Sequence, residues 1–346
     1  MSEIQTCSDR WIISSLLQKA IRRGEDETAS RAASRLFELC GAAIWRRFVV
    51  IAFEDVGVGS LAAVSSVSSA HDPDWRKEHG TDHDLAIGFA RALANSIKSR
   101  GTENVWTTAC HSPSAAIMRE AVRETGPDMV RRALQEPKLP LLVRASHIAV
   151  HPRIALGRPD QWLQPLLSSN PGPEANAVLN ATLSAARVTR EAFVLLLPLI
   201  WMQMRNAKTT VASTRAPKGC CVGDLPLYAL DKHTRLGRAA IRLFAGSNPS
   251  VRAALRAVAS GCRLQAAYMA AFYTDAIQID RKLSTTKSRR FEEMAMRADL
   301  LRTGVSVPSQ ATLQAAFAEN LEHLNQVRAE IYARGQQAML NPGDRG

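Results

Sequence analysis

The chain has 346 residues, 46% of them hydrophobic, so it can bury a sizeable core and is not disordered as a whole. Its net charge of +12 favours an anionic partner, either nucleic acid or an acidic protein. The most apolar window, residues 193–204, is shorter than the roughly 20 residues of a membrane span. Six scattered cysteines without a C-x-x-C pair suit reduced thiols. These features indicate a soluble, cytoplasmic protein without a membrane partner.

Capping residues and apolar periodicity predict a succession of short helices. Asp9 is placed to cap a first helix that Gly24 ends, and a second helix is expected over residues 25–39. Strand patterns are nearly absent, because sustained alternation is missing and alanines are many. The prediction is an all-α fold, a multi-helix array in two lobes. Further helices are expected over residues 60–70, 84–99, 225–244 and 310–334.

A boundary between two domains is predicted at residues 170–173, Asn-Pro-Gly-Pro, because this composition interrupts any helix. The predicted domains are residues 1–169 and 174–340. The second carries most of the positive charge: residues 215–302 hold 16 Lys and Arg against 7 Asp and Glu, a net charge of +9.

Residues 44–57, IWRRFVVIAFEDVG, form the stretch around which the chain is organised. Their apolar side chains cover most of a helix circumference, so this helix must be buried. The pairs Arg46-Arg47 and Glu54-Asp55 lie about two turns apart, too far to bridge each other within the helix. Each charge is therefore expected to find its partner on another helix or another subunit, since an unpaired buried charge costs several kcal/mol. The four side chains are predicted to be structural ion pairs.

Three stretches of the first lobe occur in a distinctive order: KAIRRG (residues 19–24), RRFVVIAFEDVG (46–57) and ALANSIKS (92–99). Together they resemble the carboxyl-terminal helical region of the MgsA/RarA family, the replication-associated recombination ATPases related to clamp loaders. The resemblance covers about residues 11–110, extends to 150 if a weaker match at 139–145 is counted, and excludes the second half.

The resemblance implies that the first lobe is similar to the collar-like domain that assembles clamp-loader relatives into rings. A homo-oligomer, and a separate ATPase or clamp-loader-like partner, follow as expectations. The chain itself has no G-x-x-x-x-G-K-[ST] motif and no glycine-rich dinucleotide fingerprint. ATP hydrolysis of the family's kind is therefore not predicted, and no cofactor is expected.

Residues 71–84, HDPDWRKEHGTDHD, are predicted to form a polar loop in which metal chemistry is one alternative. The candidate ligands are His71, His79 and His83. Gly80 and Asp82 argue against one continuous helix that would bring His79 and His83 to a common face. The expectation is a solvated loop, with no metal.

Basic side chains of the second lobe form three clusters. The expected helix over residues 225–244 carries arginines at i, i+3 and i+7, with Asp231 placed to pair with Arg235. A second group, which includes Arg263, is expected on one face of the next helix. The alternatives are a groove that follows phosphates and three solvated helix faces. The predicted nucleic-acid contacts are Arg235, Arg238, Arg242, Arg252, Arg256, Lys282, Arg289 and Arg290.

The favoured function is that of a non-catalytic accessory protein of DNA replication, recombination or a mobile element, which binds DNA through these arginines and assembles through the collar-like lobe. A protein-interaction scaffold with an acidic protein partner is the second hypothesis. The third is a metal-dependent hydrolase that uses residues 71–84.

Overall fold

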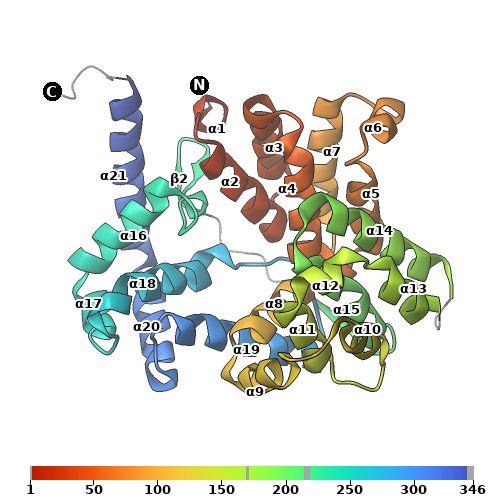
Figure 1. Ribbon diagram of the computed structural model, residues 1–346. Coiled ribbons are helices and arrows are strands. Elements are labelled where there is room, and N and C mark those ends of the chain that lie inside the picture. Colours follow the sequence, from red (N-terminus) through yellow and green to blue (C-terminus); the bar gives the residue numbers. More distant parts are fainter. Residues whose placement is uncertain (1, 169–170, 214–218, 341–346) are drawn as a thin grey trace.

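The computed structural model describes residues 2–168, 171–213 and 219–340. Helices dominate these residues, and strands within them are confined to two small antiparallel sheets of two strands each. The prediction of an all-α fold is therefore confirmed. Figure 1 shows the amino-terminal helices along the top from the centre to the right, the central helices at the right and lower centre, and most of the carboxyl-terminal helices at the left.

The first helices form where capping residues and apolar periodicity predict them. Asp9 caps α2 by accepting hydrogen bonds from the backbone amides of Trp11 and Ile12, and Gly24 ends it with φ of 73°. α2 packs against α3, which packs against α7. The elements are α1 (Glu3–Thr6), α2 (Arg10–Arg23), α3 (Asp26–Cys40), α4 (Ala43–Ile51), η1 (Ala52–Val56), η2 (Gly57–Gly59), α5 (Leu61–Ser69), α6 (Pro73–His79) and α7 (Asp82–Asn95).

The organising stretch is a helix that changes its pitch. α4 is α-helical, and η1 continues it as a π-helix, whose wider turn occurs frequently at functional sites. Gly57 then ends η1 with φ of 48°, and a Cβ atom there would lie 2.8 Å from the Ser99 carbonyl oxygen. Glycine is therefore required by both the backbone conformation and the close approach of residue 99.

Helices of the central part surround α8, which packs against α11 and α19. The Ser112 side chain caps α9, and Pro113 occupies its first turn. The elements are α8 (Gly101–His111), α9 (Pro113–Val122), α10 (Pro127–Gln135), α11 (Leu141–Val150), α12 (Pro152–Gly157), α13 (Asp160–Ser168), α14 (Pro173–Thr189), η3 (Ala192–Leu195) and α15 (Leu196–Met204).

The carboxyl-terminal part returns to the first helices through short strands. β1 pairs with β4, and Lys98 joins β4 from the other side: the Leu283 amide donates to the Lys98 carbonyl at 2.8 Å. The elements are β1 (Thr210–Ala212), β2 (Cys221–Val222), β3 (Leu225–Pro226), η4 (Leu227–Ala229), α16 (Arg235–Ser247), α17 (Pro249–Leu255), η5 (Ser260–Cys262), α18 (Arg263–Ala271), η6 (Phe272–Ala276), β4 (Lys282–Ser284), α19 (Thr286–Arg302), α20 (Val307–Glu319) and α21 (Leu321–Leu340).

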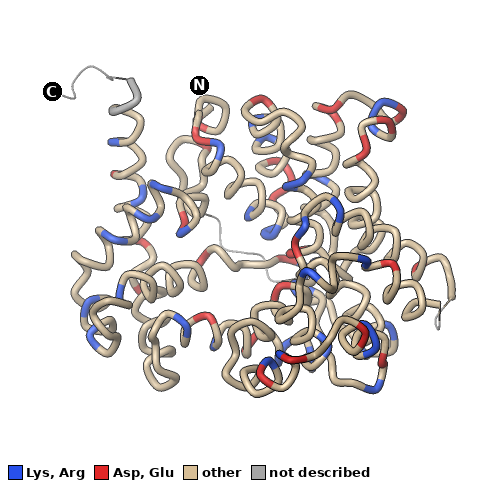
Figure 2. Tube along the Cα trace, viewed as in Figure 1, with Lys and Arg blue, Asp and Glu red and all other residues tan. Residues whose placement is uncertain are grey.

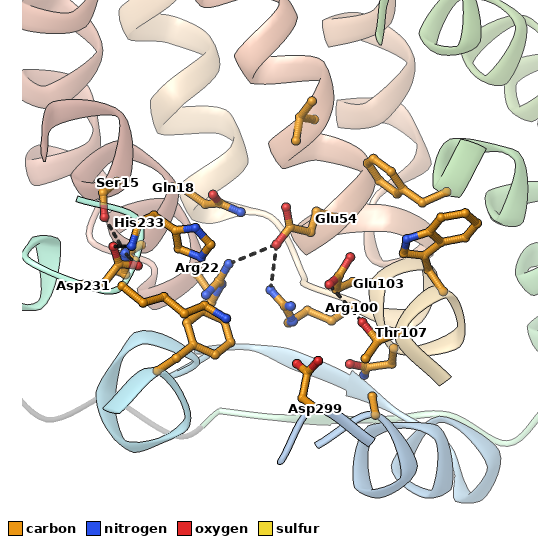
Figure 3. Close-up of a pocket in the computed structure, with 18 of the residues that line it drawn as sticks. Ser15, Gln18, Arg22, Glu54, Arg100, Glu103, Thr107, Asp231, His233 and Asp299 are labelled. Atoms are coloured by element: carbon orange, nitrogen blue, oxygen red, sulfur yellow. Dashed lines mark hydrogen bonds and ion pairs between the residues drawn. The ribbon is translucent and has the colours of Figure 1, made fainter. Parts of the chain in front are cut away.

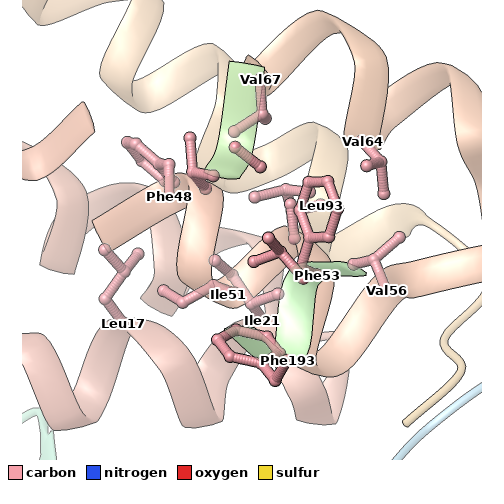
Figure 4. Close-up of a cluster of buried hydrophobic side chains, with 14 of the residues drawn as sticks. Leu17, Ile21, Phe48, Ile51, Phe53, Val56, Val64, Val67, Leu93 and Phe193 are labelled. Atoms are coloured by element: carbon pink, nitrogen blue, oxygen red, sulfur yellow. The ribbon is translucent and has the colours of Figure 1, made fainter. Parts of the chain in front are cut away.

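The buried apolar side chains form two main clusters, a large first one and a smaller second one, and a third cluster of four residues. Figure 4 shows part of the first, where Phe53 and Val56 of η1 meet Val64 of α5 and Leu93 of α7. α14 and α15 contribute to this same cluster. The second cluster lies among α16, α17, α18, α20 and α21. The predicted boundary at residues 170–173 stays a prediction, and residue 170 lies outside the described residues.

Four local predictions are wrong. Residues 71–84 are not a loop, because they contain α6 and the start of α7. The helix expected over 225–244 begins only at Arg235, after β3 and η4, because Pro226 and the turn at 231–234 interrupt it. The helix expected over 310–334 is two helices, α20 and α21, which meet at Asn320. The second group of arginines does not share one helix, because α17 ends at Leu255 and Arg263 begins α18.

We expect the η1 side chain Phe53 to be essential for stability. It is fully buried, so Phe53→Ala would open a cavity and lower the free energy of unfolding by about 3 to 5 kcal/mol. Ile117→Ala is the control, because Ile117 is 79% exposed and its loss should cost about 0.5 kcal/mol or less. Urea denaturation measures both variants. Equal effects of the two changes would contradict the burial of Phe53.

Candidate functional site

A buried carboxylate, Asp55 of η1, collects donors from two other helices. Arg22 of α2 donates to it through Nε at 2.8 Å and through Nη2 at 3.1 Å. Arg100, the residue before α8, donates through Nη1 at 2.6 Å. Gln18 of α2 donates through Nε2 at 2.8 Å. Three segments of the chain are therefore tied to one side chain that is fully buried.

Asp55 is ionised in this environment. Burial alone would raise its pKa, but the guanidinium groups of Arg22 and Arg100 outweigh burial and bring the pKa down to about 2. Glu54, the adjacent residue, also faces both arginines, at 3.6 Å from Arg22 and 3.4 Å from Arg100. Figure 3 shows the two guanidinium groups converging on Glu54. The neighbouring carboxylates thus share one pair of cations.

Arg22 also joins the two π-helical segments of the chain, η1 and η6. Arg22 Nη1 donates to the Ala276 carbonyl oxygen of η6 at 2.5 Å, while Nε and Nη2 of this side chain bind Asp55 of η1. Asp275 of η6 accepts hydrogen bonds from the fully buried Arg328 of α21, at 2.5 and 3.3 Å. The amino-terminal helices and the second apolar cluster are therefore connected through charged groups.

A cavity of about 540 Å³ lies beside this network. α2, η1, α8, η6 and α19 contribute to its wall, together with the turn at residues 231–233 (Figure 3). Both halves of the chain thus form it, and it has the size of a small-molecule site. The residues that line the cavity include Gln18, Lys19, Arg22, Arg47, Glu54, Arg100, Glu103, Trp106, Asp231, Lys232, His233, Phe272, Tyr273 and Asp299.

An ion pair between α2 and the turn before α16 closes one side of the cavity. Lys19 Nζ lies 2.6 Å from Asp231 Oδ2, and both side chains are almost completely buried. Burial tends to raise the pKa of Asp231, but Lys19 opposes it and the pKa falls to about 2. The predicted partner, Arg235, is exposed instead. His233, two residues after Asp231 in the same turn, is an exposed side chain at the edge of the cavity.

A second group of carboxyl side chains also lines the cavity: Figure 3 shows Asp299 of α19 at the bottom and Glu103 of α8 beside Arg100. Asp299 accepts from the Tyr273 hydroxyl at 2.8 Å and from Arg302 Nε at 2.8 Å. Glu103 accepts one hydrogen bond, from Thr107 at 3.2 Å. Burial, and then the negative charge of Glu54, raise the pKa of Glu103 to about 7. Glu103 can therefore gain or lose a proton near neutral pH.

Three of the four charges of the organising stretch, Arg46, Glu54 and Asp55, form ion pairs with residues elsewhere in the chain, whereas Arg47 does not form the predicted ion pair. Arg46 pairs with Glu191 at 3.0 Å, and Arg47 Nη2 donates to Gln18 Oε1 at 2.5 Å. Arg47 therefore binds an amide and not a carboxylate. Glu54 and Asp55 bind the arginines described above. Their structural role is supported, and in addition Arg47 and Glu54 line the cavity.

The candidate metal ligands are not brought together. His79 of α6 stacks on Trp75 with ring centroids 3.7 Å apart, and its Nδ1 lies 2.7 Å from the Trp75 carbonyl oxygen. His83 of α7 instead contacts the Ser34 hydroxyl at 2.9 Å. Burial lowers the pKa of His71, in the turn after α5. Among the described residues, no group of three His, Cys, Asp or Glu side chains could hold a metal ion.

Six arginines of α16 to α18 form an exposed surface, which we call the arginine surface. None of them lies within 4.0 Å of a carboxylate oxygen in the described part of the chain. Three line a groove of about 350 Å³ together with Ala245 and Gly246, at the end of α16. Figure 2 shows blue positions and no red ones along α16 and α17, at the left. The six are Arg235, Arg238, Arg242, Arg252, Arg256 and Arg263.

The third basic cluster lies on other elements. Lys282 is half-buried in β4 and pairs with Glu292, at 2.5 Å from its Oε1. Arg289 and Arg290 are exposed near the start of α19, which packs along α8. The arginine surface belongs instead to helices that pack on α20 and α21. The three clusters lie on different elements, and the common groove stays a prediction.

Sequence reasoning missed the residues that complete the cavity. The helix predicted over residues 225–244 includes Lys232 and His233, so the helical pattern gives no indication of their position in a turn against α2. Glu103 and Asp299 are isolated acids within amphipathic helices, and no spacing signal links them across 196 positions. The one available signal was the polar composition of KAIRRG beside an apolar helix.

No helix in the described ranges is both long and apolar enough to cross a membrane. Comparison with protein-family models, with curated proteins and with solved structures finds no match to this chain. The resemblance of residues 11–110 to the MgsA/RarA helical region therefore stays a prediction.

We expect Asp55→Asn to lower the free energy of unfolding by roughly 3 to 5 kcal/mol, because it leaves the buried Arg22 and Arg100 with only the more distant Glu54 carboxylate as their anion. The matched control is Glu120→Gln, which breaks an exposed pair with Arg123 and should cost about 0.5 kcal/mol or less. Chemical denaturation at pH 7 compares them. A loss no larger for Asp55→Asn than for Glu120→Gln would show that the network is not structural.

Glu103 should make stability depend on pH in the neutral range. The pKa of Glu103 is about 7 in the folded chain against an ordinary value of 4.5, so the folded state keeps this proton up to a higher pH than the unfolded state does. The free energy of unfolding should therefore fall as pH rises from 4.5 to 7, by roughly 3 kcal/mol. Glu103→Gln should remove this fall, whereas the exposed control Glu124→Gln should keep it. Denaturation series at several pH values test this, and identical profiles for wild type and Glu103→Gln would refute it.

Proposed function

We propose that this protein is a nucleic-acid-binding accessory protein, and that the arginine surface of α16 to α18 is its contact surface. The observation that carries the proposal is the absence of acidic residues beside these arginines. Residues 232–274 contain Lys232 and six arginines and not one Asp or Glu. Such a segment is a continuous source of positive potential, which attracts polyanions from a distance.

The arrangement of the arginines supports contact with successive phosphates. Arg235, Arg238 and Arg242 follow one another at i, i+3 and i+7, so they share a face of α16. Arg242 lies one turn before Ala245 and Gly246, which line the groove with Arg252. The stripe on α16 therefore leads into the groove between α16, α17 and α18.

The chemistry of the side chains also favours phosphate. Guanidinium groups are always charged, and their planar donors match phosphate oxygens in pairs. An arginine engaged with a protein carboxylate is less available, but the six arginines have no such partner among the described residues. Exposed cations at this density are consistent with either nucleic acid or an acidic protein. The groove with its flanking stripe favours the regular charge spacing of a nucleic acid.

A role in DNA replication, recombination or a mobile element is the part of the proposal that rests on the MgsA/RarA resemblance. Assembly into a homo-oligomer through residues 11–110 and a separate ATPase partner belong to it as well. Two of the three stretches that carry the resemblance meet in space, because Arg22 of the first pairs with Glu54 and Asp55 of the second. This convergence supports a shared structural role for them.

The proposal predicts a salt-dependent affinity for DNA that depends on the arginine surface. If all six arginines contact phosphates, log K against log[salt] should have a slope of roughly −5 for duplex DNA. The triple variant Arg238→Gln, Arg242→Gln, Arg252→Gln should reduce the magnitude of this slope by about 3. Fluorescence anisotropy with labelled single- and double-stranded DNA at several salt concentrations measures both.

The matched control removes the same charge elsewhere, by Arg91→Gln, Arg132→Gln and Arg153→Gln on α7, α10 and α12, where all three side chains are exposed. The slope of log K against log[salt] should be nearly as steep for this control variant as for the wild-type protein. Equal losses in the two triple variants would mean that only net charge matters. Tighter binding of polyglutamate than of DNA would replace the proposal by the acidic-protein alternative.

A further inference from the structure

The cavity between α2, η1 and η6 contains two cationic side chains that lack an anionic partner. Arg47 donates from Nη2 to Gln18, but its buried Nε has no hydrogen-bond partner. No carboxylate oxygen of the described residues lies within 4.0 Å of the Arg47 guanidinium. Its neighbour in the cavity wall, Arg100, also has a buried Nε without a partner.

Lys232 is the second such cation. Its ammonium lies 4.1 Å from the centre of the Phe272 ring and 3.4 Å from the sulfur of Met269. These contacts leave donors of the ammonium without an oxygen acceptor. The adjacent Asp231 is engaged with Lys19, so it does not neutralise Lys232.

Arg47 and Lys232 are half-buried cations without a carboxylate oxygen of the described residues within 4.0 Å. Burial lowers the pKa of both side chains, because it disfavours their charged forms. The remaining lining charges are mostly paired within the wall: Lys19 with Asp231, Arg302 with Asp299, and Arg22 and Arg100 with Asp55. A bound anion would offset the cost of the two unpaired cations.

The rest of the cavity is suited to a ligand with a flat part. Trp106 and Phe272 contribute aromatic side chains to the wall. Its volume of about 540 Å³ lies within the range of small-molecule and cofactor sites. The two π-helical segments, η1 and η6, contribute residues to the wall of the cavity, and such segments occur frequently at functional sites.

We propose that this cavity binds a small phosphorylated molecule of mononucleotide size, whose negative charge is compensated by Arg47 and Lys232. The aromatic side chains would contact its base or other flat group. The site is distinct from the arginine surface, since the two share no residue. It is thus independent of the proposed nucleic-acid binding.

Isothermal titration calorimetry with the full chain tests the proposal, with adenosine 5′-monophosphate, ribose 5-phosphate, inorganic phosphate and adenosine as ligands. We expect the phosphorylated ligands to bind and adenosine to bind at least about tenfold more weakly. Arg47→Gln and Lys232→Gln should each weaken binding about tenfold or more. Arg46→Gln is the matched control, because Arg46 is the adjacent arginine but is half-exposed and pairs with Glu191.

A 5′-phosphorylated trinucleotide distinguishes a free nucleotide from the end of a strand. Binding of the monophosphate at least as tight as that of the trinucleotide supports the proposal, whereas binding of the trinucleotide alone overturns it. The arginine-surface triple variant should keep the monophosphate affinity, which separates this test from that of the proposed function.

Thermal unfolding of the wild-type protein gives a readout that does not depend on variants. A phosphorylated ligand that binds the folded chain should raise Tm above its value in chloride of equal ionic strength. No rise, together with no heat of binding for any phosphorylated ligand at about 1 mM, would overturn the proposal. So would unchanged affinity in both Arg47→Gln and Lys232→Gln when both variants are folded by circular dichroism.

Discussion

The ion-pair network at Asp55 determines how the parts of this chain are held together. Asp55 is fully buried, and its two oxygens accept from Arg22, Arg100 and Gln18. Taking these charges out of water is costly, and the cost is compensated only when every partner is in place. α2, η1 and the start of α8 are therefore fixed relative to one another by a single carboxylate. Apolar packing around Phe53 supplies stability, while the network supplies a defined arrangement.

Arg22 extends this arrangement to the carboxyl-terminal part of the chain. Its Nη1 group binds the Ala276 carbonyl of η6, and Asp275 of η6 binds Arg328 of α21. A line of polar contacts thus runs from η1 through η6 to the last helix. The cavity lies beside this line, so its shape depends on both apolar clusters. The proposed ligand site therefore lies where the amino-terminal helices meet the part of the chain that carries the arginine surface.

Local sequence patterns were sufficient for the helices but not for the site. Asp9, Gly24 and Ser112 act as predicted because capping depends on neighbouring residues along the chain. The partners of Glu54 and Asp55 were expected on other helices, but periodicity carries no information about which helix. The pairing of Lys19 with Asp231 spans 212 positions and required the turn at 231–234, which the helical pattern of residues 225–244 concealed. The division of the last helix at Asn320 was likewise hidden by a continuous apolar stripe.

The π-helical pitch of η1 has a consequence for how this chain can vary. A π-helix holds one more residue per hydrogen-bonded turn than an α-helix, so the positions after it are offset from α-helical register. A homologous chain that lacked one residue between Ala52 and Val56 would retain nearly the same apolar content. Its acidic pair would nevertheless rotate by about 100° about the helix axis and lose Arg22 and Arg100. The length of this segment is therefore constrained as well as the identities of Phe53 and Asp55.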